Sequence, residues 1–209
     1  MNNIYDSMNY YRQKNNYYTI DELMNKIGIN NTIIDPFSTL ISKELCIGQG
    51  NVFYPAVRID VSADSSVIIG NNNIFSNNTV VFCENHSKII IGDSNFFGDG
   101  QICIKCNMSN STISFSNNGR YDGRINIYGS CKFGNGSQII GTINVYNCCL
   151  IGGEDYNESD PWKRAGLIKG FGTAKNLTVN VGMVINGNGF FDQKSMEPQI
   201  NYHKVKGNN

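Results

Sequence analysis

Histidine is scarce in this 209-residue chain, which has only two, His86 and His203, together with four prolines and one tryptophan. Net charge is missing as well, because 17 Lys and Arg balance 17 Asp and Glu, and only 16% of the residues are charged. A chain without a positive excess lacks the electrostatic attraction on which binding to polymeric nucleic acid depends. We therefore expect no nucleic acid polymer among its partners.

Long apolar runs are also absent. None approaches the roughly 18 residues that a membrane-spanning helix needs, so we expect no membrane association. The segment MNNIYDSMNYYRQKNN at the start contains no basic stretch followed by an apolar one, which a secretory signal requires. These features predict a cytoplasmic protein. The seven cysteines then predict reduced thiols rather than a disulfide framework.

The abundant residues indicate turns, since the chain has 32 Asn and 22 Gly. They accompany an internal repeat in which an apolar residue, often followed by Gly, recurs at 22-residue intervals and then at intervals of 17 to 20 residues. The repeat places this residue at Ile47, Ile69, Ile91, Ile113, Phe133, Ile151, Ile168 and Ile185. Such regular spacing is typical of a solenoid.

Within a repeat, further apolar residues fall six and twelve places on, as in Ile47/Phe53/Ile59, Ile69/Phe75/Val81, Ile91/Phe97/Cys103 and Phe133/Ile139/Val145. The fourth repeat keeps Ile113 and Ile125 but has Gly119 between them. Three six-residue sides predict a triangular coil, and hence an all-β protein with the fold of a left-handed parallel β-helix. A right-handed parallel β-helix with coils of similar length is the alternative.

Coils of 22 residues need extra residues beyond three six-residue sides. The polar segments 62–66, 83–88 and 105–112 fit loops on the third side, because Asn, Asp, Ser and Gly tolerate turn conformations. Stacking of such coils aligns the inward side chains into continuous ladders. We expect the repeated Asn residues at the coil corners to form hydrogen-bonded ladders in the same way.

The repeat divides the chain into three parts. Residues 1–45 precede it and contain Thr-x-x-Glu from Thr19 to Glu22, which predicts a short helix near residues 20–27 as an N-terminal cap. Residues 46–191 form the predicted β-helix. Residues 192–209 lose the pattern and are expected to be a packed C-terminal arm or a disordered tail.

The segments IGQGNVFYPAVRI, IIGNNNIFSNNTVVF and IIGDSNFFGDGQICI resemble the hexapeptide-repeat family of left-handed parallel β-helix proteins. The likeness is greatest to acetyltransferases that modify sugars on oxygen or nitrogen in polysaccharide synthesis. It implies a homotrimer with ligand sites in the clefts between subunits and acetyl-CoA as the acyl donor.

The same resemblance implies a histidine as general base, since the acceptor must lose a proton as it attacks the thioester. In similar sugar acetyltransferases this histidine follows the coil that corresponds to residues 91–112, where KCNMSNSTISFSNNGR contains none. His86, one coil earlier, is the candidate base, with Glu84 to orient it; the alternative is a solvated corner residue. Two distant histidines cannot build the three-histidine zinc site of hexapeptide-fold carbonic anhydrases, so no metal is expected.

Residues 152–164 interrupt the six-residue rhythm and carry the single tryptophan. Trp162 followed by Lys163 and Arg164 fits stacking on a planar base beside a phosphate. Packing of the indole under the loop or into a subunit interface is an equally good interpretation.

A second cluster consists of Tyr121 with Arg120 and Arg124 on either side, and all three are expected to bind a ligand. The two guanidinium groups suit bidentate binding of an anionic ligand. Salt bridges between subunits are the alternative role for them.

Two functions from different classes follow. The first is an acyltransferase that moves an acetyl group from acetyl-CoA to a sugar or a small amine. The alternative is a catalytically inactive trimer that sequesters an anionic small molecule, such as a nucleotide, in its inter-subunit clefts. The sequence leaves open whether the protein is an enzyme.

Overall fold

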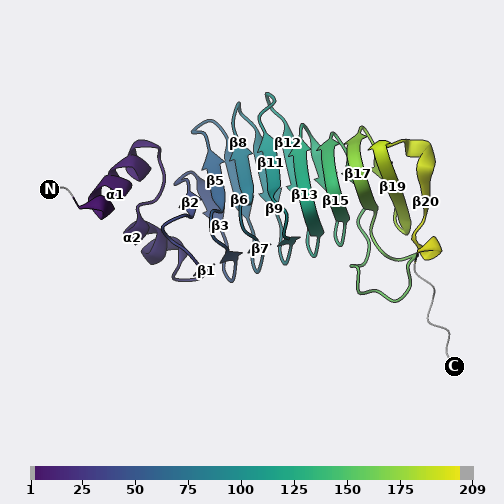
Figure 1. The fold of residues 1–209 in the computed structure, drawn as a ribbon, viewed down its shortest axis with the longest axis horizontal. Coiled ribbons are helices and arrows are strands. Elements are labelled where there is room, and N and C mark those ends of the chain that lie inside the picture. The colour runs from purple at the N-terminus through teal and green to yellow at the C-terminus, as the bar shows by residue number, and fades with distance from the viewer. Residues whose placement is uncertain (1–2, 203–209) are drawn as a thin grey trace.

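A computed structural model describes residues 3–202 and shows a long solenoid of stacked strands preceded by helices (Figure 1). Each complete coil gives one strand to each of three sides, and strands of successive coils pair in parallel. The predicted all-β parallel β-helix is therefore confirmed. In this part of the chain, no helix has the length and apolar character needed to cross a membrane.

The strands are grouped by side. The first side holds β3 (Leu45–Ile47), β6 (Ser66–Ile69), β9 (Lys88–Ile91), β12 (Thr112–Phe115), β14 (Cys131–Phe133), β16 (Cys149–Leu150) and β18 (Thr178–Val179). The second side begins with β1 (Thr32–Ile33), β4 (Val52–Phe53), β7 (Ile74–Phe75) and β10 (Phe96–Phe97). The third side begins with β2 (Leu40–Ile41), β5 (Arg58–Val61), β8 (Val80–Cys83) and β11 (Ile102–Cys106).

In the later coils one long strand runs along both the second and the third side. These strands are β13 (Arg120–Tyr128), β15 (Gln138–Tyr146), β17 (Leu167–Lys175) and β19 (Met183–Phe190). A glycine at positive φ bends each of the first three where the sides meet, and Gly123, Gly141 and Gly170 stack in register. Glycine takes this backbone conformation without the steric cost that a Cβ brings.

The core consists of inward ladders, one residue per strand and coil. On the second side the rings of Phe53, Phe75, Phe97 and Tyr121 follow one another with centroids 5.0–5.2 Å apart. All four are completely buried. Each coil alone cannot bury such a ring, so stability is shared between neighbouring coils.

The third coil, which begins at Ile91, is longer than the sequence predicted. Ile69 and Ile91 stack as expected, but the residue paired with Ile91 is Phe115, while Ile113 lies over Ile89. The 22-residue interval therefore fails at this coil. One extra residue lies in the corner 98–101 and one in the corner 107–111, and as a consequence Tyr121 rather than Gly119 occupies the second-side ladder.

Two other ladder assignments were wrong. On the third side Ile104, not Cys103, continues the column above Val81, because the corner 98–101 brings one more residue into β11. Beyond Phe133 the first-side column continues through Leu150 and Val179, and Ile168 and Ile185 lie on the second side. The inserted loop between β16 and β17 displaced the sequence-based register.

All seven cysteines are free thiols, and four of them are buried, namely Cys83, Cys106, Cys131 and Cys148. Burial raises the pKa of the Cys131 thiol to about 12. A thiol with such a pKa stays neutral and packs as a small apolar group.

The predicted asparagine ladder is present at the corner before the second side. Asn51, Asn73 and Asn95 are buried. The side-chain oxygens of Asn51 and Asn73 each accept bonds of 2.9–3.1 Å from the backbone and side-chain nitrogens of the next Asn, and that of Asn95 accepts from the Gly119 N–H. Asn73 Nδ2 also donates to the Gly92 carbonyl at 2.8 Å. Asn31 extends the ladder by one coil towards the N-terminus.

We expect Asn73→Ala to lower the free energy of unfolding by about 2 to 3 kcal/mol, because it leaves the buried backbone N–H of Asn95 and the Gly92 carbonyl without partners. Urea denaturation followed by circular dichroism measures the change. Asn77→Ala, at an exposed position in the same coil, is the control and should change stability by less than about 0.5 kcal/mol. Equal effects of the two variants would contradict the ladder's contribution.

The N-terminal cap contains the predicted helix and one that was not predicted. The helix starts as α2 (Ile20–Glu22) and continues as a π-helix, η1 (Leu23–Ile27), after the expected capping box between Thr19 and Glu22. The unpredicted helix is α1 (Ile4–Lys14). The solenoid also begins before residue 46, because β1 and β2 already pair with β4 and β5.

The described part of the C-terminal segment forms a packed arm. It contains η2 (Gln193–Ser195), β20 (Met196–Pro198), which pairs antiparallel with β19, and η3 (Gln199–Asn201). The buried Gln199 fixes the arm by donating from Nε2 to the Ala165 and Met183 carbonyls. Residues 203–209 lie outside the described part, and His203 with them.

Candidate functional site

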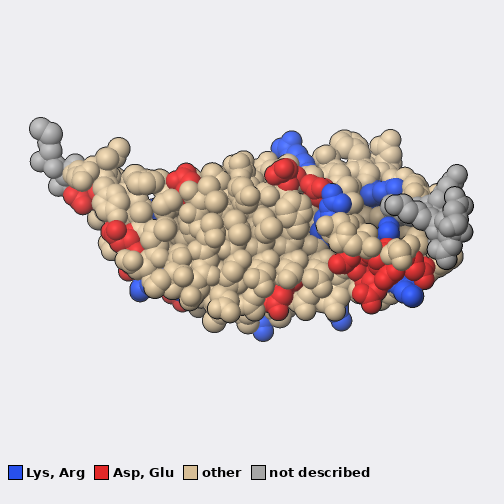
Figure 2. Space-filling model, turned by 90° about the horizontal axis from the view of Figure 1, so that it is seen from below, with Lys and Arg blue, Asp and Glu red and all other residues tan. Residues whose placement is uncertain are grey.

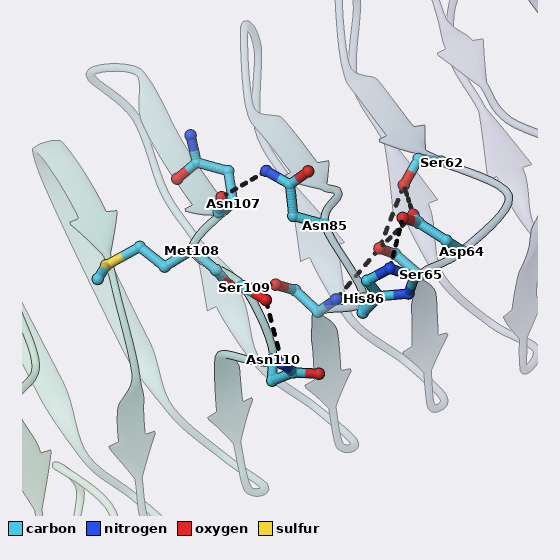
Figure 3. Close-up of polar contacts among 10 residues, drawn as sticks. Ser62, Asp64, Ser65, Asn85, His86, Asn107, Met108, Ser109 and Asn110 are labelled. Carbon is cyan, nitrogen blue, oxygen red and sulfur yellow. Dashed lines mark hydrogen bonds and ion pairs between the residues drawn. The ribbon is translucent and has the colours of Figure 1, made fainter.

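His86 lies at the corner between β8 and β9, with its backbone in the left-handed region (φ 58°) and 69% of its side chain exposed. Its Nε2 atom is 3.6 Å from Oδ2 of Asp64, which occupies the corresponding corner one coil earlier (Figure 3). The carboxylate that pairs with His86 is thus Asp64. The prediction of Glu84 as its partner was wrong. Equivalent corner positions of stacked coils are neighbours, whereas residues two apart in one turn need not be.

Asp64 is held as a carboxylate by its own corner. The hydroxyls of Ser62 and Ser65 donate to Oδ1 of Asp64, and these bonds, with the nearby His86, lower the pKa of the Asp64 carboxyl. Because Nε2 of His86 faces this carboxylate, Nδ1 is the ring nitrogen that does not face Asp64. Asp64 precedes His86 by one 22-residue coil, and that interval was a sequence signal for this partner.

Three successive corners, residues 62–65, 84–87 and 107–111, form a polar surface around His86 that we name the corner shelf. Backbone and side-chain bonds join its layers: Asn85 Nδ2 donates to the Asn107 carbonyl at 2.9 Å, and the Asn110 N–H donates to the Asn85 carbonyl at 3.2 Å (Figure 3). Beneath it the buried Ser87 hydroxyl donates to the Met108 carbonyl at 2.7 Å. The shelf therefore presents amide and hydroxyl groups from a fixed backbone.

The predicted ligand residue Tyr121 is not available to a ligand. Its side chain is fully buried in the second-side ladder, and its hydroxyl lies 3.1 Å from that of Ser137. Burial raises the pKa of this phenol above its usual range. The two extra residues of the third coil place Tyr121, and not Gly119, at the inward position of this ladder.

The two arginines around Tyr121 lie on different sides of the solenoid. Arg120, on the second side, forms an ion pair with Asp122 at 2.9 Å and covers the ring of Tyr156 with its guanidinium carbon 5.2 Å from the centroid. Arg124 lies past the bend at Gly123 and is exposed on the third side. The structure thus does not bring the pair to one anion.

The loop that carries Trp162 contains its own acidic partners. Lys163 Nζ is 3.8 Å from Asp160, and Arg164 Nε donates to the Glu158 carbonyl at 2.7 Å. The indole of Trp162 is 52% exposed. Figure 2 shows basic and acidic side chains together towards the C-terminal end of this face, and few charges over the middle. The basic side chains of this loop are therefore already partnered, and its indole remains open to a ligand.

Comparisons with known proteins gave matches only in solved structures. No family model matches the chain, and no curated protein matches it. It is similar to a UDP-N-acetylglucosamine acyltransferase from Campylobacter jejuni, with 14% identity and a TM-score of 0.33 over 75% of this chain and 72% of that one.

Two further structures are similar. A mutant perosamine N-acetyltransferase from Caulobacter crescentus, in complex with CoA and GDP-perosamine, is 14% identical with a TM-score of 0.29 over 86% of this chain. The acetyltransferase domain of PglB from Neisseria gonorrhoeae FA1090 is 11% identical with a TM-score of 0.23 over 77%. The chain spans 62% and 57% of the lengths of these two proteins.

Proposed function

We propose that the protein is an acyltransferase that uses acetyl-CoA to acetylate a hydroxyl or amine of a sugar or small amine on the corner shelf. The observation that carries this proposal is the exposed imidazole of His86 facing the ionised Asp64 across one coil. A histidine ordered by a carboxylate is the arrangement that general base catalysis needs. The repeats that resemble sugar acetyltransferases favour this reaction among those a histidine can assist.

In this proposal His86 accepts the acceptor's proton at Nδ1 as the acceptor oxygen or nitrogen bonds to the thioester carbonyl carbon. Asp64 stabilises the imidazolium that results. The bond between that carbon and the sulfur breaks, and His86 returns the proton to the leaving thiolate. Amide and hydroxyl donors of the shelf, such as Asn110, would stabilise the negative charge on the carbonyl oxygen.

The residues around the shelf suit CoA in their chemistry. Bound acetyl-CoA would supply the activated acyl group. Lys88 begins β9 directly after the His86 corner, and Lys105 lies in β11 next to the following corner. The ammonium groups of these two lysines would bind the phosphates of CoA. The amides of the shelf would donate hydrogen bonds to the pantetheine amides and accept hydrogen bonds from them.

We also propose that the protein works as a homotrimer, so that a neighbouring subunit completes the cleft at the shelf. The support is an apolar outer surface near the first coils of the second side. It includes the exposed side chains of Ile34, Phe37 and Tyr54. Exposed apolar residues gathered in this way mark protein interfaces.

We expect His86→Asn to lower kcat/KM by about 100-fold, because Asn keeps the left-handed backbone and polarity but cannot take up a proton. The measurement is acetyl transfer from acetyl-CoA to a panel of sugars and amines. Asp64→Asn should reduce the rate less, by about tenfold, and shift the pH profile, since it acts through His86.

Asn78→Ser is the matched control, because Asn78 is exposed and left-handed on a different corner, and it should leave the rate unchanged. Activity retained by a folded His86→Asn protein would refute the proposed base. If acetyl-CoA leaves the melting temperature unchanged while a nucleotide raises it, the protein is the non-catalytic anion-binding trimer instead.

A further inference from the structure

The outer surface of the third side over the last coils is composed differently from the rest of the solenoid. Beyond their glycine bends, β13 and β15 turn every second residue outward, and these residues pair in register. They are Arg124, Asn126, Tyr128, Thr142, Asn144 and Tyr146. The two tyrosine rings stack with centroids 4.9 Å apart, and Asn126 Nδ2 donates to Asn144 Oδ1 at 2.9 Å. These contacts between neighbouring side chains hold the surface in a fixed conformation before any ligand binds.

The next two strands, β17 and β19, extend this surface towards the C-terminal end (Figure 1). The outward residues of β17 are Phe171, Thr173 and Lys175, and Phe190 of β19 pairs with Thr173. Phe171 is 61% exposed and Phe190 is 90% exposed. Large aromatic side chains left in water at adjacent positions indicate a surface that a partner covers. We call the outward residues of β13, β15, β17 and β19 beyond the bends the third-side platform.

The charge of the platform indicates the charge that its partner carries. Its outward positions include Arg124 and Lys175 but no carboxylate. Within residues 3–202, neither of these two cations takes part in an ion pair, in contrast to Arg120 and Lys163. They lie two strands apart, with parallel strands spaced by about 4.8 Å, and Lys175 is displaced by four residues along the strand because it is in register with Tyr128. The platform therefore suits an extended partner with repeated negative charges.

We infer that the third-side platform binds an acidic polysaccharide. Sugar hydroxyls both donate and accept, and so do the amides of Asn126 and Asn144 and the hydroxyls of the threonines and tyrosines. The exposed rings of Phe171 and Phe190 offer apolar contact to the C–H faces of pyranose rings, and the cations pair with uronate carboxylates. Strand spacing is close to the length of one pyranose unit, so a chain along the solenoid axis passes one outward side chain of each strand, for example Asn126, Asn144 and Thr173.

Single-stranded nucleic acid fits this surface less well. Its phosphates only accept hydrogen bonds, whereas the platform also presents the amide oxygens of Asn126 and Asn144 as acceptors. The rings of Tyr128 and Tyr146 stack on each other, which leaves Phe171 and Phe190 as the rings open to a base. The inference goes beyond the proposed acyl transfer, because the platform contains no residue of the corner shelf and its binding needs no acyl donor.

The experiment uses the full chain and immobilised polygalacturonate, with dextran as the uncharged comparison, and measures binding by biolayer interferometry at low salt. We expect binding to polygalacturonate but not to dextran. The double variant R124Q/K175Q should weaken it by about tenfold or more, because hydrogen bonds to charged groups contribute strongly. Phe171→Ser should weaken it without changing the charge.

The matched control is K14Q/K132Q, which removes the same charge at exposed positions on α1 and on the first side. This control should change the affinity for polygalacturonate by no more than about twofold, because charges distant from the platform act on the ligand only through screened long-range electrostatics. Equal losses in the two double variants, or no binding to polygalacturonate, would overturn the inference. Tighter binding of oligo(dT) that depends on the same residues would also overturn the inference. A change of oligomeric state in Phe171→Ser with unchanged polysaccharide binding would overturn it as well, because the platform would then be an interface between copies of the chain.

Discussion

Gly141→Ala is expected to destabilise the protein by about 3 kcal/mol or more, or to prevent folding. Gly141 has φ 128°, a backbone conformation that residues with a Cβ rarely adopt. A Cβ at this position would also penetrate the carbonyl oxygen of Gly170 in the next coil. Because that carbonyl belongs to a paired strand on a stacked coil, it cannot move away without breaking the ladder. Urea denaturation measures the loss.

Gly189→Ala separates the cost of the positive φ from the cost of the steric clash with the next coil. Gly189 has φ 86°, but a Cβ there would meet no atom within 4 Å among the described residues. It should therefore cost only the backbone term, about 1 kcal/mol. If Gly141→Ala costs no more than Gly189→Ala, close stacking of the glycine bends is not what requires glycine.

Phe75→Ala is expected to lower the free energy of unfolding by about 3 to 5 kcal/mol. Phe75 is fully buried between Phe53 and Phe97, whose ring centroids are 5.1 and 5.0 Å away. Its removal leaves a cavity inside the ladder, and the rigid stack of strands limits how far the coils can close it. The loss affects the coils on both sides, since each coil is stabilised mainly by its neighbours.

The control for this variant is Ile74→Ala in the same strand. Ile74 points outward and is 36% exposed, so its truncation should cost about 1 kcal/mol or less. Denaturation of both variants by urea, followed at several wavelengths, shows the difference and any loss of cooperativity. Similar losses for the two neighbours would mean that the inward ladder does not dominate stability.

The fold could be predicted from the sequence because the repeat records it directly. Ile69 and Ile91 stack as their equal spacing predicted, and the Asn51–Asn73–Asn95 ladder formed for the same reason. The capping box at Thr19 likewise fixed the start of α2 from neighbouring residues alone. Helix α1 was missed, since its outer residues include exposed tyrosines and only Arg12 is buried, so no apolar face marked it.

The candidate site could be predicted only in part. His86 was found at an exposed corner, but its carboxylate partner was assigned to Glu84, two residues away, instead of Asp64, one coil away. Tyr121 was assigned to a ligand because neighbouring arginines suggested it, although its ring completes the core. Both errors arose because contacts across coils depend on the length of every corner between them.

The sequence by itself determined the class of fold, the inward ladders of the regular coils and the position of His86 on a corner. It could do so because a solenoid repeats one local rule, and that rule is visible as a period in the apolar residues. Only the tertiary structure decided where the register shifts, which carboxylate faces His86 and which cations remain unpaired. Loops of different length close at nearly the same free-energy cost, so the chain accepts insertions at corners, and only the stacked strands reveal which residues then meet.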